Sequence, residues 1–153
     1  MCMYHVMRLL IQRVNKAQVT VENKIVGKIQ QGLCVFVGIA ANDTAAVLEK
    51  MANKLVQLRI FEDPAGKMNL SLLDVAGQAL LVSQFTLLAD CSKGRRPAFI
   101  GAGDPQKAEE LYKHFCKMVA ATGIAVQTGI FAADMTVLIE NDGPCTFWLD
   151  SEK

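Results

Sequence analysis

The sequence contains only two histidines, His5 and His114, and none of its five cysteines form a Cys-x-x-Cys pair. Zinc sites are usually built from closely spaced cysteines and histidines, and a Ser-His-Asp triad needs a correctly placed histidine. His114 lies next to the apolar stripe of a predicted helix, so we expect it on the surface. The sequence therefore predicts no metal site and no cofactor, and the usual sets of catalytic side chains are missing.

Long hydrophobic runs and a strong net charge are also lacking. No apolar run reaches the length of a membrane-spanning helix, so we predict no membrane partner. The net charge of +1 excludes a strong overall attraction to nucleic acid, although it leaves room for a local basic patch. The cysteines are odd in number and widely spaced, which predicts reduced thiols and a cytoplasmic location. They are Cys2, Cys34, Cys91, Cys116 and Cys145.

The chain has 153 residues, of which 52% are hydrophobic and 20% are charged. This composition predicts one globular domain with a sizeable core. Residues 1–6 precede a second methionine and lack the basic region and apolar segment of a signal peptide. We expect them to be an N-terminal extension outside the fold, and residues 7–153 to form a single domain.

Strand patterns are more frequent than helix patterns. Alternating apolar residues predict strands at 8–14 and 17–21, and residues 16–29 form a predicted hairpin. The continuous apolar run at 32–39 predicts a central buried strand. Further strands are predicted at 60–61, 78–88, 126–128, 136–139 and 145–149.

Two helices are predicted from apolar residues at helical spacing. The first follows capping oxygens in Asn42-Asp43-Thr44 and runs to about Leu58, and the second follows Asp104-Pro105 and ends at Gly123. Most connections between the strands are too short for parallel crossovers. The predicted fold class is therefore α+β: a mainly antiparallel, curled or barrel-like β-sheet with two main helices packed on it.

The segment Asn141-Asp142-Gly143-Pro144 separates the last two predicted strands. Its residues are typical of turns, but proline directly after glycine removes a backbone N–H and allows a cis peptide bond at low cost. Two interpretations stay open at this point. The segment is either a plain turn or a backbone device that presents the carbonyl groups of Gly143 and Pro144 to a ligand.

A second candidate site lies at Ser83-Gln84-Phe85-Thr86, near the end of a predicted strand. Thr86 as a nucleophile would need a base, and none is visible nearby. Cys145 has no histidine linked to it in sequence, and a cysteine in a strand usually acts as a small hydrophobic residue. Backbone N–H groups near Phe85 and Thr86 remain. They can stabilise an oxyanion if the substrate brings its own activating group.

The connection at residues 89–104 is long and polar and contains Lys93, Arg95 and Arg96. Loops of this length in compact domains often have a function. Gly101-Ala102-Gly103 is not a phosphate-binding loop, because the Gly-Lys-Ser/Thr ending is absent.

Ser83-Gln84-Phe85-Thr86-Leu87 and Asn141-Asp142-Gly143-Pro144-Cys145-Thr146 together resemble the paired signature of the D-aminoacyl-tRNA deacylases, also called D-tyrosyl-tRNA deacylases. The resemblance extends from Met7 to about Leu149. Cys145 departs from it, since the family usually has a valine of similar size there. Further matching blocks are Ile11-Gln12-Arg13-Val14, Arg59-Ile60-Phe61, Lys67-Met68-Asn69-Leu70, Arg96-Pro97 and Phe131-Ala132-Ala133-Asp134-Met135.

The resemblance implies a homodimer with two active sites at its interface. Each subunit would insert a cis Gly143–Pro144 motif, held by Arg13, into the site of its partner. The resemblance places the catalytic side at Ser83, Gln84, Phe85 and Thr86. It places the pocket for the terminal adenosine of aminoacyl-tRNA at Phe131, Ala132, Ala133 and Met135.

The implied reaction is hydrolysis of the ester bond in D-aminoacyl-tRNA, and also in glycyl-tRNA, which releases the amino acid and tRNA. The 2′-hydroxyl of the RNA would assist the reaction, and the motif carbonyls would leave no room for an L side chain. This is a chiral proofreading activity in translation.

Two alternatives remain open from the sequence. One is a related deacylase with a trans Gly-Pro bond that acts on L-aminoacyl-tRNA, and the geometry of the Gly143–Pro144 peptide bond discriminates it. The other is a non-catalytic module that binds the tRNA end, favoured by the lack of a side-chain acid or base. The sequence does not specify which amino acids or tRNAs are preferred.

Overall fold

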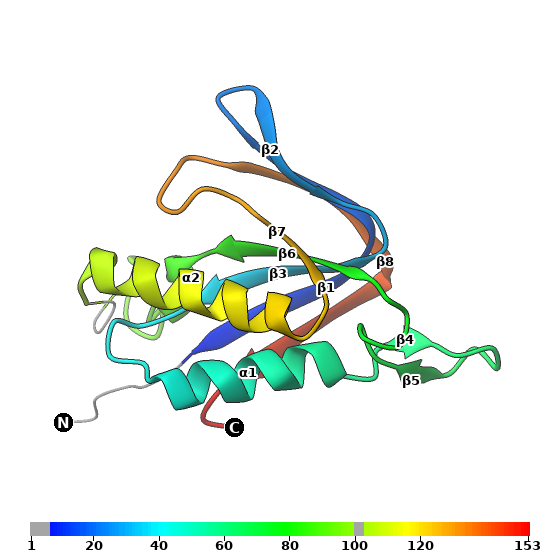
Figure 1. The fold of residues 1–153 in the computed structure, drawn as a ribbon. Helices are drawn as coiled ribbons and strands as arrows, with labels where there is room; N and C mark the ends of the chain where they lie inside the picture. Colours follow the sequence, from blue (N-terminus) through cyan, green and yellow to red (C-terminus); the bar gives the residue numbers. More distant parts are fainter. Residues whose placement is uncertain (1–6, 100–102) are drawn as a thin grey trace.

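Two helices lie against one face of a strongly curved sheet in the computed structural model of the chain, which describes residues 7–99 and 103–153 (Figure 1). The expected extension at residues 1–6 falls outside the described residues. The main sheet contains β1 (Arg8–Val21), β2 (Lys24–Ile29), β3 (Gly32–Gly38), β6 (Gln78–Ser83), β7 (Ala125–Thr128) and β8 (Thr136–Asp150). A small sheet contains β4 (Phe61–Glu62) and β5 (Met68–Leu70), and the helices are α1 (Ala45–Gln57) and α2 (Pro105–Ala121).

Both helices begin and end as their sequences predict. The side chain of Thr44 accepts a hydrogen bond from the Val47 N–H at 3.3 Å at the start of α1. Asp104 does the same for the Gln106 N–H at 3.0 Å, one residue before Pro105 begins α2. These caps satisfy N–H groups that have no partner within the helix. Gly123, with φ +100°, follows the end of α2.

The sheet is mainly antiparallel, as predicted, but it also contains parallel pairs. β1 pairs antiparallel with β2, β3 and β8, but β3–β6 and β6–β7 are parallel pairs. The segments that connect these parallel strands contain α1 and α2, and a helix is the usual crossover between parallel strands. The predicted α+β class, with a curled sheet and two helices packed on it, is confirmed.

The first and last strands are longer than predicted and bend together. Residues 8–14 and 17–21 were expected to be two strands, but they form one strand, β1, along which β8 pairs from Asp150 to Thr136. The pairing is irregular between Gln12 and Val14 and between Val14 and Lys16. Bulges of this kind bend a strand without ending it, and the bend carries β8 over the sheet (Figure 1).

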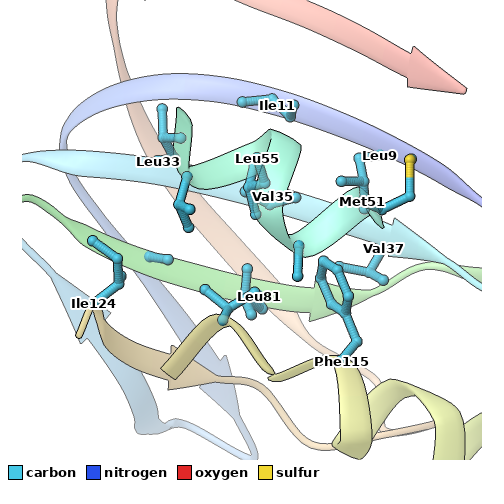
Figure 2. Close-up of a cluster of buried hydrophobic side chains, with 14 of the residues drawn as sticks. Leu9, Ile11, Leu33, Val35, Val37, Met51, Leu55, Leu81, Phe115 and Ile124 are labelled. Carbon is cyan, nitrogen blue, oxygen red and sulfur yellow. The ribbon is translucent and has the colours of Figure 1, made fainter. Parts of the chain in front are cut away.

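Apolar side chains fill both faces of the sheet. On the helix side, Phe115 of α2 and Met51 and Leu55 of α1 meet Val35 and Leu81 of the sheet (Figure 2). The opposite face has a second cluster, which contains Val14, Ala17, Val19, Ile29, Cys34, Leu80 and Val82. Because strand residues alternate between faces, β3 and β6 contribute to both clusters. The central strand predicted at 32–39 is therefore confirmed as buried.

The histidine and the cysteines of the described residues lie where no catalytic role was predicted for them. His114 is exposed, as expected. Cys34, Cys91, Cys116 and Cys145 are free thiols, and Cys2 lies outside the described residues. Burial raises the pKa of Cys34 to about 12 and that of Cys116 to about 11. Neither helix in the described part of the chain is long and apolar enough to cross a membrane.

Candidate active site

A cavity of about 550 Å³ opens where β6 ends, beside the start of α2 and the loop between β7 and β8. Its walls are largely apolar and come from four segments that are distant in sequence. The lining residues are Ile39, Val82, Ser83, Gln84, Phe85, Gly103, Pro105, Ala108, Phe131, Ala132, Ala133, Asp134, Met135 and Val137.

The fold brings most of the predicted site residues together in this cavity. Ser83, Gln84 and Phe85 line one part, and residues 131–133 and Met135 line another, as the two sequence motifs implied. Ala132 has a φ of +64°, a conformation that residues other than glycine rarely adopt. Such backbone positions often occur at ligand-binding sites. Thr86, in contrast, is exposed and does not line the cavity.

The strand predicted at 78–88 ends at Ser83, and Phe85–Leu88 form a 3₁₀ turn, η1. The Gln84 N–H donates to the Val37 carbonyl at 2.8 Å, and the Leu87 N–H donates to the Gln84 carbonyl at 3.2 Å. Since β3 ends at Gly38, no ladder partner is left for the residues that follow. Within the described residues, the N–H groups of Phe85 and Thr86 have no backbone acceptor.

The hydroxyl of Thr86 accepts a hydrogen bond from the side-chain amide of Gln84. In the part of the chain that the structure describes, no carboxylate or imidazole is hydrogen-bonded to this hydroxyl. An amide N–H is a donor and cannot remove a proton. The geometry therefore gives Thr86 no general base.

Asn141-Asp142-Gly143-Pro144, which the sequence placed between two separate strands, forms a bulge inside the single strand β8. Val14 pairs with Asn141 and Gln12 with Thr146, so residues 142–145 have no ladder partner on β1. The side chain of Asn141 closes this bulge. Its Nδ2 donates to the carbonyls of Arg13 and Cys145, each at 2.9 Å, and its Oδ1 accepts from the Cys145 N–H at 3.3 Å.

Arg13 lies beneath the bulge with only 5% of its surface exposed. Its Nη1 donates to the Ile60 carbonyl at 2.7 Å, and its Nε lies 3.2 Å from Oδ2 of Asp142. A guanidinium offers several donors in a fixed plane, so these two contacts hold the side chain in one orientation. Arg13 therefore links the bulge to the segment that precedes β4.

Gly143 has a φ of +128°, and its peptide bond to Pro144 is cis. A Cβ atom at Gly143 would lie 3.2 Å from Nη2 of Arg13 and 3.2 Å from the nitrogen of Cys145. Both the backbone conformation and the lack of space therefore favour glycine. Burial raises the pKa of the adjacent Cys145 thiol, although the positive charge of Arg13 acts in the opposite direction.

The bulge and the cavity lie apart within one chain. Arg13 pairs with Leu33 of β3, whereas Ser83 pairs with Val37, four residues further along the same strand. At the usual rise per residue in a strand, this is a separation of about 13 Å along the sheet. Arg13, Gly143 and Pro144 do not line the cavity, and the latter two are exposed.

Sequence reasoning missed several residues of both regions. Pro105 and Ala108 of α2 and Ile39 after β3 complete the cavity wall. Asp134, which belongs to the matching block at 131–135, is the one charged lining residue among the described residues. The predicted cap at Asp104-Pro105 marked where the helix begins but not that this end lies beside the end of β6. Asn141 was interpreted as a turn residue, because its two carbonyl partners become neighbours only in the fold. Within residues 7–99 and 103–153, no group of three His, Cys, Asp or Glu residues is arranged to hold a metal.

Comparison with known proteins identifies close relatives over almost the whole chain. It is 52% identical over 147 residues to a D-aminoacyl-tRNA deacylase from Fervidobacterium nodosum, with 96% of this chain and 99% of that protein covered. It is 54% identical over 147 residues to the enzyme of the same name from Desulfotalea psychrophila, again with coverage of 96% and 99%. A protein of that name from Thermomicrobium roseum is 54% identical over 145 residues, with coverage of 95% and 94%.

Two solved structures share the fold. A c-Myc DNA unwinding element binding protein superposes with a TM-score of 0.87 at 39% identity, covering 93% of this chain and 97% of that one. A probable eukaryotic D-amino acid tRNA deacylase superposes with a TM-score of 0.81 at 22% identity, covering 95% and 99%. The family model described as D-Tyr-tRNA(Tyr) deacylase matches residues 10–150, which include both the cavity and the bulge, and the chain therefore belongs to this family.

Proposed function

We propose that this protein is a D-aminoacyl-tRNA deacylase, an enzyme that hydrolyses the ester between a D-amino acid and the terminal ribose of tRNA. The products are the free amino acid and tRNA, and the reaction belongs in the cytoplasm. The observation that carries the proposal is the cavity that joins Ser83, Gln84 and Phe85 to residues 131–135, in a chain more than half identical to proteins named for this activity.

In the proposed mechanism, the substrate and the backbone supply the chemistry. The 2′-hydroxyl of the terminal ribose activates a water molecule, whose oxygen attacks the ester carbonyl. The N–H groups of Phe85 and Thr86, which lack a backbone acceptor among the described residues, donate to the oxyanion. The 2′-hydroxyl relays the proton that the water gives up to the ribose 3′-oxygen, which leaves as an alcohol while the carbonyl carbon becomes the carboxylate of the free amino acid. Such a route suits a site in which the Thr86 hydroxyl is bonded to an amide and, across residues 7–99 and 103–153, to no base.

Chiral selection is proposed to need a second subunit. The exposed Gly143–Pro144 segment lies too far from the cavity of its own chain, so it would enter the cavity of a partner. There its carbonyls would accept hydrogen bonds from the substrate α-ammonium group and leave no room for an L side chain. Glycine has no side chain to exclude, so glycyl-tRNA would be hydrolysed as well.

The surface around the bulge supports the proposed homodimer. Trp148 and Leu138 of β8 are 50% and 61% exposed, although both are large and apolar. Residues of this kind are enriched where subunits meet. Phe147 and Leu149, the apolar neighbours of Trp148 in β8, instead pack against the first core cluster.

The deciding experiment is incubation of the protein with D-aminoacyl-tRNA, L-aminoacyl-tRNA and glycyl-tRNA, with loss of the ester measured over time. We expect hydrolysis of the D and glycyl esters only. Binding without hydrolysis would instead indicate a module that holds the tRNA end, and hydrolysis of L esters would indicate the related deacylase. Light scattering on the same sample tests the dimer, since a stable and active monomer would contradict the proposed shared site.

A further inference from the structure

The segment at residues 90–99, called the basic loop below, projects beside the cavity and has no role in the proposed mechanism. Its ends are joined by two backbone hydrogen bonds between Asp90 and Ala98, at 2.7 and 2.9 Å. Directly after this closure, the ring of Phe99 contacts the ring of Phe85, with 5.1 Å between their centroids. Because Phe85 lines the cavity, the basic loop is anchored at the cavity wall.

Three cations occupy the tip of the basic loop: Lys93, Arg95 and Arg96, all exposed. Within the described residues, none of them forms an ion pair with a carboxylate. Asp90 is the one carboxylate in the segment, and hydrogen bonds from Ser92 hold its pKa below the usual range. Three cations and one carboxylate leave an excess of two positive charges. The whole chain has a net charge of only +1, so the positive charge is concentrated here.

The aromatic pair at the base of the loop is unusually exposed. Phe85 is 56% exposed and Phe99 is 41% exposed, although the two rings touch. An exposed ring next to a row of cations is the arrangement with which proteins bind single-stranded nucleic acid, because bases stack on the ring and phosphates lie along the cations. The exposed ring of Phe99 is therefore accessible for stacking with a nucleic-acid base.

We propose that the basic loop binds the single-stranded RNA that immediately precedes the terminal nucleoside of the substrate. In this arrangement, a base stacks on Phe99, and the phosphates contact Lys93, Arg95 and Arg96. The inference rests on the proposed function, which places the terminal adenosine in the cavity. The described cavity lining holds no cation, so positive charge for the phosphodiester chain has to come from outside the lining, and the basic loop adjoins the cavity wall through the contact of Phe99 with Phe85.

The first test compares two substrates of one enzyme. D-Aminoacyl-tRNA carries the phosphates, and a D-aminoacyl ester of adenosine has none. Replacing the three cations by glutamine should raise KM for D-aminoacyl-tRNA and flatten its dependence on salt. The slope of log(kcat/KM) against log[salt] should fall by about 2, at roughly 0.7 per lost phosphate contact. Hydrolysis of the adenosine ester and kcat for both substrates should stay unchanged.

Phe99→Ala tests the stacking separately from the charge. It should raise KM for D-aminoacyl-tRNA about fivefold to a hundredfold, the usual range for a lost base–aromatic contact, and leave the salt slope unchanged. The matched control for charge replaces Lys50 and Lys54 of α1 and Lys67 of the β4–β5 turn by glutamine. These side chains are also exposed, and β4 and β5 lie at the other end of the molecule from the start of α2 (Figure 1). The control should behave as the unmodified protein.

The second test measures binding without hydrolysis. A fluorescent single-stranded RNA ending in CCA should bind the unmodified protein more tightly than it binds the triple glutamine variant or Phe99→Ala. The binding measurement tests RNA recognition by the basic loop independently of the proposed deacylase activity. Loop-dependent RNA binding without deacylation would refute the deacylase and leave the loop assignment standing.

Three outcomes would overturn the inference about the loop. The first is equal binding of the RNA by the unmodified protein and the loop variants. The second is an equal loss of activity towards both substrates, since the adenosine ester cannot reach the loop. The third is an equal effect of the loop variants on single-stranded and double-stranded RNA, which would make the loop a general polyanion site.

Discussion

The two regions that the family signature links are built in opposite ways. The cavity region has apolar walls, an exposed phenylalanine and backbone N–H groups with no backbone acceptor among the described residues. The bulge region has a buried arginine with two polar contacts and an asparagine with three hydrogen bonds. The difference matches the two tasks proposed for these regions, which are nucleoside binding for the cavity and rejection of L substrates for the bulge. A nucleoside pocket tolerates small movements, whereas a device that rejects a substrate by lack of space needs atoms in fixed positions.

The largest effect is expected when the 2′-hydroxyl of the substrate is removed, because it is the group that activates the water in the proposed mechanism. A D-aminoacyl-tRNA ending in 2′-deoxyadenosine, charged on its 3′-hydroxyl, should be hydrolysed at least about 1,000-fold more slowly than the normal substrate, because no side chain replaces the missing hydroxyl. Single-turnover rates for the two substrates give the answer. Equal rates would show that the protein itself activates the water.

Arg13→Ala should have the next largest effect, because it removes the support of the bulge region. The variant leaves the Ile60 carbonyl and Asp142 without their partner. We expect a loss of about 2 kcal/mol in the free energy of unfolding, less than for a fully buried pair because the Asp142 side chain is 45% exposed. The kcat/KM for D-aminoacyl-tRNA should fall at least about 100-fold, and discrimination against L substrates should weaken.

Arg13→Lys serves as its control. Lysine keeps the positive charge but lacks the planar guanidinium that contacts both Ile60 and Asp142. The activity of Arg13→Lys should therefore lie between that of the original protein and that of Arg13→Ala. Denaturant melts and deacylation rates measured on the same samples separate stability from activity. Full selectivity in Arg13→Ala would show that the bulge holds its shape without this side chain.

Gly143→Ala changes the tip of the bulge and leaves its support in place. The positive φ and the short distances to Arg13 and Cys145 should lower the free energy of unfolding by about 1 kcal/mol or more. Hydrolysis of D-aminoacyl-tRNA and glycyl-tRNA should fall together, about tenfold or more, and L substrates should still be rejected. A variant with a lower melting temperature but unchanged rates per folded molecule would make Gly143 a structural residue only.

Thr86→Ala should have a small effect, since the side-chain amide of Gln84 is the one partner of the hydroxyl among the described residues and Thr86 does not line the cavity. We expect kcat/KM to stay within about tenfold of the original value. Initial rates at limiting substrate measure this. A loss of about 10,000-fold would make Thr86 the nucleophile.

Cys145→Val should have the smallest effect. The thiol is buried and its raised pKa keeps it neutral at pH 7, so it acts as a hydrophobic group of about the size of valine. The kcat/KM should change less than about twofold, and the variant and the original protein should have the same pH profile between about pH 7 and pH 9. If kcat/KM changes with pH in this range for the original protein but not for Cys145→Val, the thiolate has a role in the reaction.

The parts of the fold that depend on neighbouring residues were predictable from the sequence. The caps at Thr44 and Asp104 and the hairpin within residues 16–29 are set by local hydrogen bonding and backbone preference, and the structure has them where they were expected. The same holds for the alternation that buries β3 on both faces. These features need no information from distant parts of the chain.

The sequence predictions that were wrong concern features that depend on residues distant in sequence. The apolar residues after Ser83 favour a strand, but the neighbouring strand has ended, so the chain turns at Phe85. Asn141-Asp142-Gly143-Pro144 looks like a break between strands because its partners, above all Arg13, are remote in sequence. The cavity could be assigned from the two motifs through the family resemblance, but its outer wall from α2 could not. The contact between Phe85 and Phe99 has no sequence signal at all.

The pairing of the first strand with the last has a consequence for biosynthesis. Asn141 and Arg13, which together shape the bulge, are separated by 128 positions. A ribosome must therefore complete nearly the whole chain before this contact can form, and such distant contacts slow folding. A product truncated before residue 141 would contain the residues of the cavity without the bulge. The segment proposed to select substrates would thus be among the last to take shape in each newly made molecule.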